Sequence, residues 1–190
     1  WPLLRKTVWN TTFRCRDGGA MFHVITGGSG SGKSAFAEQC VLDFGPAERI
    51  YVATMYPYDE ECHARIARHR QMRSRKQFST VEHYTDLAGL SVPAECVVLL
   101  ECMSNLTANE MYQAQGAGQN TVTAVMAGID SLLGRARHLV VVTNEIFSDG
   151  MRYDEETLRY QRYLGEINAR MGRLADAVTE VVCGIPLRVK

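Results

Sequence analysis

The sequence of 190 residues lacks the features that mark several classes of protein. Its 21 basic and 21 acidic residues balance, so the basic excess typical of a nucleic-acid-binding protein is absent. Its six cysteines form no C-x-x-C pair and no zinc-ligand spacing, which favours free thiols in a reducing cytosol. No apolar run approaches the ~20 residues that cross a bilayer. We therefore expect a cytoplasmic protein with no membrane span and no nucleic-acid partner, whose ligands are small anions held locally.

The chain does contain a glycine-rich stretch that fits a phosphate-binding pattern at every fixed position. Residues 27–34 read Gly-Gly-Ser-Gly-Ser-Gly-Lys-Ser and match G-x-x-x-x-G-K-[ST]. A strand candidate at 22–26 precedes the loop and a helix pattern follows from Ala35, which is the context that the motif requires. The backbone N–H groups of such a loop and the positive end of its helix bind anionic oxygens. The alternative is a flexible glycine–serine loop, and the flanking strand and helix favour nucleotide binding.

The motif gives particular roles to its residues. The nucleotide-binding residues of the loop are predicted to be Gly27, Gly28, Ser29, Gly30, Ser31, Gly32, Lys33 and Ser34. Lys33 is the predicted catalytic cation, which reaches the β- and γ-phosphates, and the Ser34 hydroxyl is a predicted ligand of Mg²⁺.

A second predicted magnesium ligand ends another strand candidate. The nearly all-apolar run 96–101 ends in Glu101, as expected of a parallel strand buried on both faces. Its carboxylate should lie at the carboxyl edge of the sheet beside the loop, where it would bind Mg²⁺ directly or through water. Two alternatives stay open for Glu101, which are a contact to substrate and a solvated strand end.

Alternating strand and helix patterns predict an α/β fold of the P-loop NTPase type, with a mostly parallel sheet flanked by helices. Further strands are expected at 49–54, 78–82, 96–101 and 138–143, and helices at 104–113, 121–135 and 155–174. Two runs at 178–183 and 187–190 flank Gly184-Ile185-Pro186 and predict a C-terminal antiparallel hairpin at the edge. Residues 21–190 are expected to form a single domain, preceded at 1–20 by a disordered or non-native extension.

A basic segment at 59–76 is a further candidate for chemistry. Its pattern is helical, and its cations Arg65, Arg68, Arg70, Arg73, Arg75 and Lys76 surround His69. His69 shares a helical face with the apolar Cys62 and Ile66. The cations favour the neutral, nucleophilic imidazole and would hold a triphosphate near it. The alternative is a solvated helix face.

These landmarks resemble those of the bifunctional adenosylcobinamide kinase/adenosylcobinamide-phosphate guanylyltransferase family of cobalamin biosynthesis, from residue 21 to residue 190. Besides the phosphate loop, the matching motifs are Tyr-Val-Ala-Thr at 51–54, Arg-Ile-x-x-His-Arg-x-x-Arg at 65–73, Thr-Val-Glu at 80–82, Leu-Leu-Glu-Cys at 99–102, Val-Thr-Asn-Glu at 142–145, Gly-x-x-Asn at 165–168 and Val-Cys-Gly-Ile at 182–185.

The resemblance implies a two-step transferase that assembles as a homotrimer. In the first step, ATP or GTP phosphorylates the aminopropanol hydroxyl of adenosylcobinamide. In the second, GMP passes from GTP to a histidine and then to the new phosphate, which gives adenosylcobinamide-GDP. His69 occupies the position of the guanylylated histidine. The implied nucleotide contacts beyond the loop are Ala53, Thr54, Met55, Arg70, Gln71, Met72, Arg73, Glu82 and Glu101.

Two other functions fit the same residues. One is a P-loop kinase of another small alcohol without guanylyl transfer, and the other is a nucleotide-binding regulator whose basic helix docks an acidic partner. The stretch Phe-Ser-Asp-Gly-Met-Arg at 147–152 also stands where the family commonly has Gly-Met-Gly-Ile-Val-Pro, so no corrinoid-contacting residue is predicted there.

Overall fold

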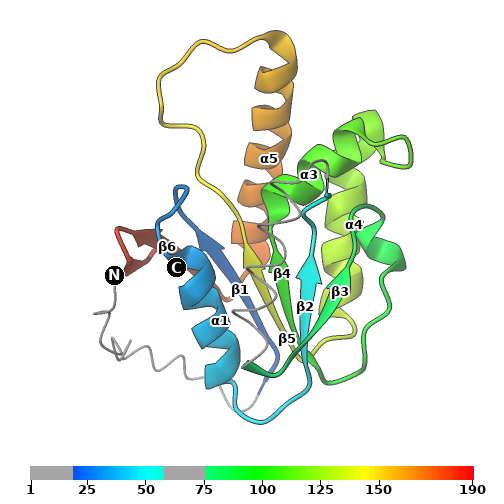
Figure 1. The fold of residues 1–190 in the computed structure, drawn as a ribbon, viewed down its shortest axis with the longest axis vertical. Helices are drawn as coiled ribbons and strands as arrows, with labels where there is room; N and C mark the ends of the chain where they lie inside the picture. Colours follow the sequence, from blue (N-terminus) through cyan, green and yellow to red (C-terminus); the bar gives the residue numbers. More distant parts are fainter. Residues whose placement is uncertain (1–18, 58–75) are drawn as a thin grey trace.

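The computed structural model describes residues 19–57 and 76–190, which contain a seven-stranded sheet in the order β3-β2-β4-β5-β1-β6-β7 (Figure 1). The strands are β1 (Met21–Thr26), β2 (Arg49–Ala53), β3 (Phe78–Glu82), β4 (Val97–Glu101), β5 (His138–Val142), β6 (Ala177–Val182) and β7 (Ile185–Arg188). All neighbouring strands are parallel except β6 and β7. The expected mostly parallel sheet with an antiparallel C-terminal edge is confirmed.

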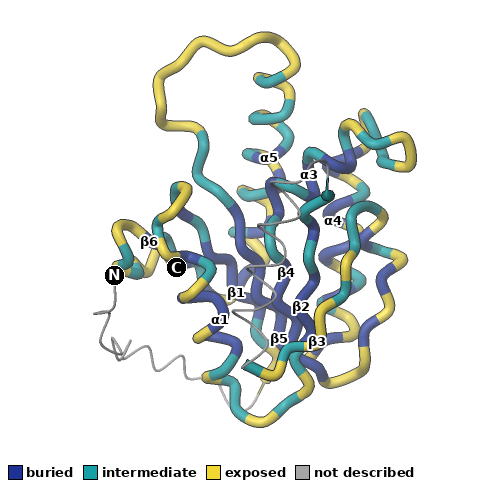
Figure 2. Tube along the Cα trace, viewed as in Figure 1, coloured by how far each residue is buried: buried dark blue, intermediate teal, exposed yellow. Residues whose placement is uncertain are grey.

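Helices cover both faces of this sheet. They are α1 (Lys33–Asp43), α3 (Met103–Tyr112), α4 (Thr121–Leu133) and α5 (Glu155–Leu174), with short 3₁₀ turns η3 (Leu87–Gly89) and η4 (Gly118–Asn120). In Figure 1, α1 lies on one side of the strands while α3, α4 and α5 gather on the other. The strands of the centre are buried on both faces (Figure 2), which is why their sequences are continuous apolar runs.

Strand β4 contributes side chains to the hydrophobic cores on both faces of the sheet. Val98 and Leu100 belong to the core beneath α3, α4 and α5, while Val97 and Leu99 belong to the core beneath α1. Successive side chains of a strand point to opposite faces, so Glu101 follows Leu99 onto the α1 side. The strand therefore places the carboxylate on the same face of the sheet as the helix that begins at Lys33.

Helix α5 projects beyond the sheet together with the segment that precedes it (Figure 1). The Asp154 side chain caps the helix by accepting a hydrogen bond from the Thr157 N–H at 2.8 Å, and Glu155 and Glu156 occupy the first turn, where carboxylates complement the helix dipole. The buried side chains of α5 begin only at Leu164, so its first turns and residues 147–154 are largely exposed (Figure 2).

The C-terminal hairpin turns earlier than the sequence indicates. Strand β7 begins at Ile185, so the expectation that Ile185 and Pro186 belong to the turn is wrong. The turn consists of Cys183 and Gly184. Their φ values are 50° and 79°, and positive φ at both positions is typical of a two-residue hairpin loop. Pro186 lies in an edge strand, where proline is tolerated.

Residues 1–18 and 58–75 lie outside the described residues. The extension expected at 1–20 and most of the basic segment at 59–76 therefore stay predictions. Lys76 is described, and its ammonium group forms an ion pair with the buried Glu38 of α1. In the two described ranges, no helix is long and apolar enough to cross a membrane.

Candidate functional site

The glycine-rich loop connects β1 to α1 and leaves the first turn of the helix open to a ligand. The N-cap residue Gly32 has φ 94° and provides no side-chain cap, and the first turn holds no acidic residue. The early N–H groups of a helix have no intrahelical partner, so they are available to an anion. The Ser31 hydroxyl oxygen is also buried without a hydrogen-bond partner among the described residues. The loop therefore presents several donors that an anionic ligand would satisfy.

Strand β6 and the hairpin turn hold this loop from one side. A Cβ atom on Gly27, whose φ is +151°, would lie 2.5 Å from the Val181 carbonyl oxygen. The Gly184 N–H donates to the Ser31 carbonyl at 2.8 Å. Glycine at position 27 is thus required by the close approach of β6, and the loop has a fixed neighbour in the hairpin.

Lys33 lies within the loop. Its side chain is buried, with a relative exposure of 8%, and its ammonium group donates to the Gly28 carbonyl at 2.9 Å. Burial lowers the pKa of Lys33, while the nearby Cys102 and Glu101 oppose this shift. The structure therefore holds one cation inside the loop that is predicted to bind phosphate groups.

The two predicted magnesium ligands come together although their elements are separated in the sheet. Strands β1 and β4 are not neighbours, because β5 lies between them. Helix α1 packs across β1, β4, β5 and β6, and this brings Ser34 to the end of β4. The Ser34 hydroxyl donates to Oε1 of Glu101. The Tyr51 hydroxyl donates to Oε2 of the same carboxylate at 3.0 Å.

The donor set of this pair fits a hard cation. Hydroxyl and carboxylate oxygens are the ligands that Mg²⁺ prefers, and Mg²⁺ usually combines one or two protein ligands with waters and substrate phosphates. Ser34 and Glu101 offer that number of oxygen ligands at the N-terminus of α1. No cluster of three or more His, Cys, Asp or Glu side chains that could hold a metal by itself occurs in the described ranges.

The other predicted nucleotide contacts on β2 and β3 lie in register with Glu101. Ala53 pairs with Glu82 on one side and with Glu101 on the other. Thr54 is fully buried, and its hydroxyl accepts from the Cys102 N–H and donates to the Cys102 carbonyl, both at 2.8 Å. Thr54 therefore ties the end of β2 to the end of β4, while the exposed Glu82 accepts a hydrogen bond from Tyr84.

The Thr-Asn-Glu segment after β5 joins three elements at this edge. The Thr143 hydroxyl donates to the Asn168 amide oxygen of α5 at 2.7 Å, and the Glu145 N–H donates to the Gly27 carbonyl at 3.1 Å. The Asn144 amide donates to the Ser104 hydroxyl at 2.6 Å.

Sequence reasoning gave no role to Ser104 or Tyr51, although Tyr51 stands in a matching motif. Their contacts depend on the sheet order, which no motif reveals.

The predicted nucleophile lies outside the described residues, as do its neighbours. His69, Arg70, Gln71, Met72 and Arg73 all fall in the range 58–75, which the structure does not describe. Of the other histidines, His23 and His138 are buried in strands. The His83 ring lies 2.9 Å from the Asp86 carbonyl.

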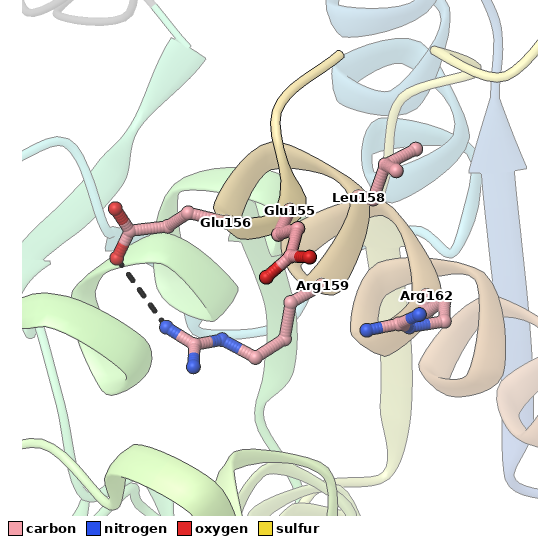
Figure 3. Close-up of a pocket in the computed structure, with 5 residues that line it drawn as sticks. All are labelled: Glu155, Glu156, Leu158, Arg159 and Arg162. Carbon is pink, nitrogen blue, oxygen red and sulfur yellow. Dashed lines mark hydrogen bonds and ion pairs between the residues drawn. The ribbon is translucent and has the colours of Figure 1, made fainter.

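A cavity of about 570 Å³ opens at the first turns of α5 and is lined by Glu155, Glu156, Leu158, Arg159 and Arg162 (Figure 3). The Arg159 guanidinium pairs with the Glu156 carboxylate at 3.3 Å. None of these residues belongs to the glycine-rich loop or to the strand ends around Glu101. The two arginines of the cavity are exposed, and the N-terminus of α5 beside it is already capped by the Asp154 side chain, so the loop at the start of α1 remains the candidate site for a phosphate ligand.

Comparisons with known proteins agree over most of the chain. Residues 23–189 match the family model described as "Cobinamide kinase / cobinamide phosphate guanyltransferase". The chain is 30% identical over 184 residues to "Bifunctional adenosylcobalamin biosynthesis protein CobU" of Escherichia coli (strain K12), with 90% of this chain and 100% of that protein covered. It is 28% identical over 177 residues to the protein named CobP of Pseudomonas aeruginosa, with 90% and 98% covered.

Among solved structures, the chain is similar to the flagellar accessory protein FlaH from Methanocaldococcus jannaschii. The TM-score is 0.49 at 11% identity, with 90% of this chain and 78% of that chain covered. The RadB recombinase gives a TM-score of 0.48 at 15% identity, with 84% and 73% covered.

Proposed function

Because this chain belongs to the cobinamide kinase / cobinamide phosphate guanyltransferase family, we propose that it phosphorylates cobinamide and then guanylylates the product in adenosylcobalamin biosynthesis. The observation that carries this proposal is the meeting of Ser34 and Glu101 at the open N-terminus of α1. A kinase and a nucleotidyltransferase both need one bound triphosphate, and this arrangement provides a site for it.

In the kinase step, the loop residues hold and orient ATP or GTP. The backbone N–H groups at the start of α1 and the Ser31 hydroxyl donate to phosphate oxygens, and the Lys33 ammonium leaves the Gly28 carbonyl to meet the β- and γ-phosphates. Ser34 and Glu101 would hold Mg²⁺, which neutralises charge on the β- and γ-phosphate oxygens when it is bound. The substrate hydroxyl oxygen then forms a bond to the γ-phosphorus while the bond from that phosphorus to the β–γ bridging oxygen breaks, so that ADP or GDP leaves and the hydroxyl proton passes to water.

In the guanylyl step, we propose that His69 is the nucleophile. A ring nitrogen of His69 forms a bond to the α-phosphorus of GTP, and the bond between that phosphorus and the bridging oxygen breaks, which releases pyrophosphate. A phosphate oxygen of adenosylcobinamide phosphate then attacks the same phosphorus and frees the imidazole. The proposed nucleotide contacts in this step are the cations Arg70 and Arg73, with Gln71 and Met72 between them. The motif at 65–73 supports this assignment.

The test is product analysis with the purified protein, adenosylcobinamide, GTP and magnesium. The proposed function predicts a GDP-linked corrinoid and one pyrophosphate for each product formed. A kinase of another alcohol would leave adenosylcobinamide unchanged, and a nucleotide-binding regulator would bind GTP without forming either phosphorylated corrinoid. Detection of adenosylcobinamide phosphate with no GDP-linked product at saturating GTP would contradict the guanylyl step alone.

We further propose that residues 21–190 form one domain, which assembles as a homotrimer in the cytoplasm. The support for assembly is a set of large apolar side chains left exposed on the projecting segment, which are Phe147, Met151 and Leu158, with relative exposures of 45%, 67% and 41%. Large apolar side chains exposed in one segment are candidates for an interaction surface. Light scattering after size-exclusion chromatography should give the mass of three chains, and Met151→Asp should lower it.

A further inference from the structure

Both oxygens of the Glu101 carboxylate accept a hydroxyl hydrogen bond. Ser34, on the first turn of α1, donates to Oε1. Tyr51, on β2, donates to Oε2 at 3.0 Å. Ser34 belongs to the phosphate-binding motif, and its contact to a strand-end acid is part of that motif's chemistry. Tyr51 belongs to no phosphate-binding motif, and its hydroxyl needs an explanation of its own.

The Tyr51 ring is held rigidly below the carboxylate. Its side chain is 3% exposed and belongs to the core beneath α1. The Phe78 ring packs against it edge to face, with 6.1 Å between the ring centroids. Tyr51 pairs with Leu99 in the neighbouring strand, two residues before Glu101 and on the same face of the sheet. The hydroxyl therefore points from the buried core toward the strand end and cannot swing away without disturbing that core.

A glutamate at this position needs such an anchor more than an aspartate would. Its side chain has one more rotatable bond, so a fixed orientation costs more conformational entropy. A rigid donor to one oxygen selects the rotamer in which the other oxygen faces Ser34. Metal sites depend on partners of this kind, because groups that bind the ligand side chains orient them toward the metal.

We propose that Tyr51 is a positioning residue for the magnesium site, which holds Oε2 of Glu101 so that Oε1 and the Ser34 hydroxyl face the same point. The inference rests on the proposed function for its metal and its nucleotide. In this role Tyr51 acts through Glu101 and is not itself a ligand of the metal or the nucleotide. The competing explanation is that the hydrogen bond only satisfies a buried hydroxyl and contributes to stability.

The experiment measures how ADP binding depends on magnesium, because ADP has no γ-phosphoryl group to transfer. Calorimetric titrations of ADP are run in EDTA and at a series of Mg²⁺ concentrations. Tyr51→Phe keeps the packed ring and removes the hydroxyl. We expect its Mg²⁺ concentration for half-maximal ADP binding to rise about 5- to 20-fold, since a hydrogen bond to a charged group is lost. Its affinity for ADP in EDTA should stay at the wild-type value.

Two further variants separate positioning from stability. Tyr163 lies on α5, and its hydroxyl donates to the Gln119 carbonyl of η4 at 3.4 Å. Tyr163→Phe removes that hydroxyl and should leave the magnesium dependence unchanged. In a Glu101→Gln background, Tyr51→Phe should cause no additional shift, because a residue that acts through Glu101 has nothing left to position. A folded Tyr51→Phe protein with the wild-type magnesium curve overturns the inference, and so does an equal shift in the Glu101→Gln background. If the wild type makes no GDP-linked corrinoid but Tyr51 still sets the magnesium response, the proposed function fails and the positioning role stands.

Discussion

Gly184 donates its backbone N–H to the carbonyl oxygen of Ser31 at 2.8 Å, so the last hairpin of the chain is bonded to its glycine-rich loop. The Gly27 backbone lies against Val181 of the same hairpin. This contact gives the family motif Val-Cys-Gly-Ile at 182–185 a structural role, because the turn at Cys183 and Gly184 supports the glycine-rich loop. The hairpin and the loop that it supports are more than 150 residues apart in the sequence.

The contact between Gly27 and β6 predicts that Gly27→Ala displaces the loop. The added Cβ would lie 2.5 Å from the Val181 carbonyl oxygen, and φ is +151°, so the loop must move or strain. We expect ATP affinity to fall by at least tenfold and the melting temperature to drop by several degrees. Gly28→Ala is the matched control for stability, because its Cβ would meet nothing within 4 Å. Equal melting temperatures for both variants would contradict this account of Gly27.

The strands of this fold could be predicted because each central one is a continuous apolar run. All five residues of β5 are buried, and its limits differ from the expected 138–143 by one residue. The turn of the C-terminal hairpin could not be placed, because Pro186 suggests a turn in sequence and yet lies in an edge strand. Proline is tolerated in a strand only where its missing N–H is not needed for pairing. Whether Pro186 can lie in a strand therefore depends on β7 being at the edge of the sheet, and the local sequence does not show this.

Lys33→Ala should strongly reduce both activities, since both begin from the same bound triphosphate. Its ammonium group is the cation held inside the loop, and removing a positioned charge at a transferring phosphoryl group costs about 3–4 kcal/mol of transition-state stabilisation. Turnover should therefore fall by about 10²- to 10³-fold in the kinase assay and in the guanylyl assay. Circular dichroism shows whether the variant is folded. Near-normal kinase turnover by a folded Lys33→Ala protein would rule out this role.

The buried His23 predicts that stability falls as the pH is lowered. Its ring nitrogen lies 2.9 Å from the Thr179 hydroxyl, and burial, assisted by the charge of Arg188, lowers the pKa of His23 to about 4. The unfolded chain takes up a proton near pH 6.5 while the folded chain does not, so this stability is present above pH 6.5 and is lost as the pH falls toward 4. The loss should reach about 3 kcal/mol.

Urea denaturation at pH 7, 5.5 and 4 measures this loss. His23→Gln is the matched variant, because its amide can hydrogen-bond to the Thr179 hydroxyl and does not titrate in this range. Its free energy of unfolding should depend less steeply on pH over the same range. Burial also lowers the pKa of His138, so the variant should keep part of the slope. Identical slopes for the wild type and His23→Gln would show that His23 does not titrate in this way.

The site could be predicted only as far as its motifs reach. The loop and the acid at the end of β4 each have a local signature, and the structure brings Ser34 and Glu101 into contact. The contact of Tyr51 with Glu101 depends on β2 lying beside β4, whereas the chain order places β3 next after β2. No short pattern encodes that neighbourhood, because it arises from the packing of all the strands.

The assignment of His69 as the nucleophile predicts a covalent intermediate that one substitution removes. Wild-type protein incubated with α-labelled GTP and magnesium should carry GMP in a bond that is labile in acid and survives alkali, as expected of a phosphoramidate. His69→Asn should carry no label and yet phosphorylate adenosylcobinamide, because direct γ-phosphoryl transfer needs positioning and no covalent step. His63→Asn and His83→Asn are the matched controls and should keep the label. Label that persists on His69→Asn and disappears from either control would transfer the role to that histidine.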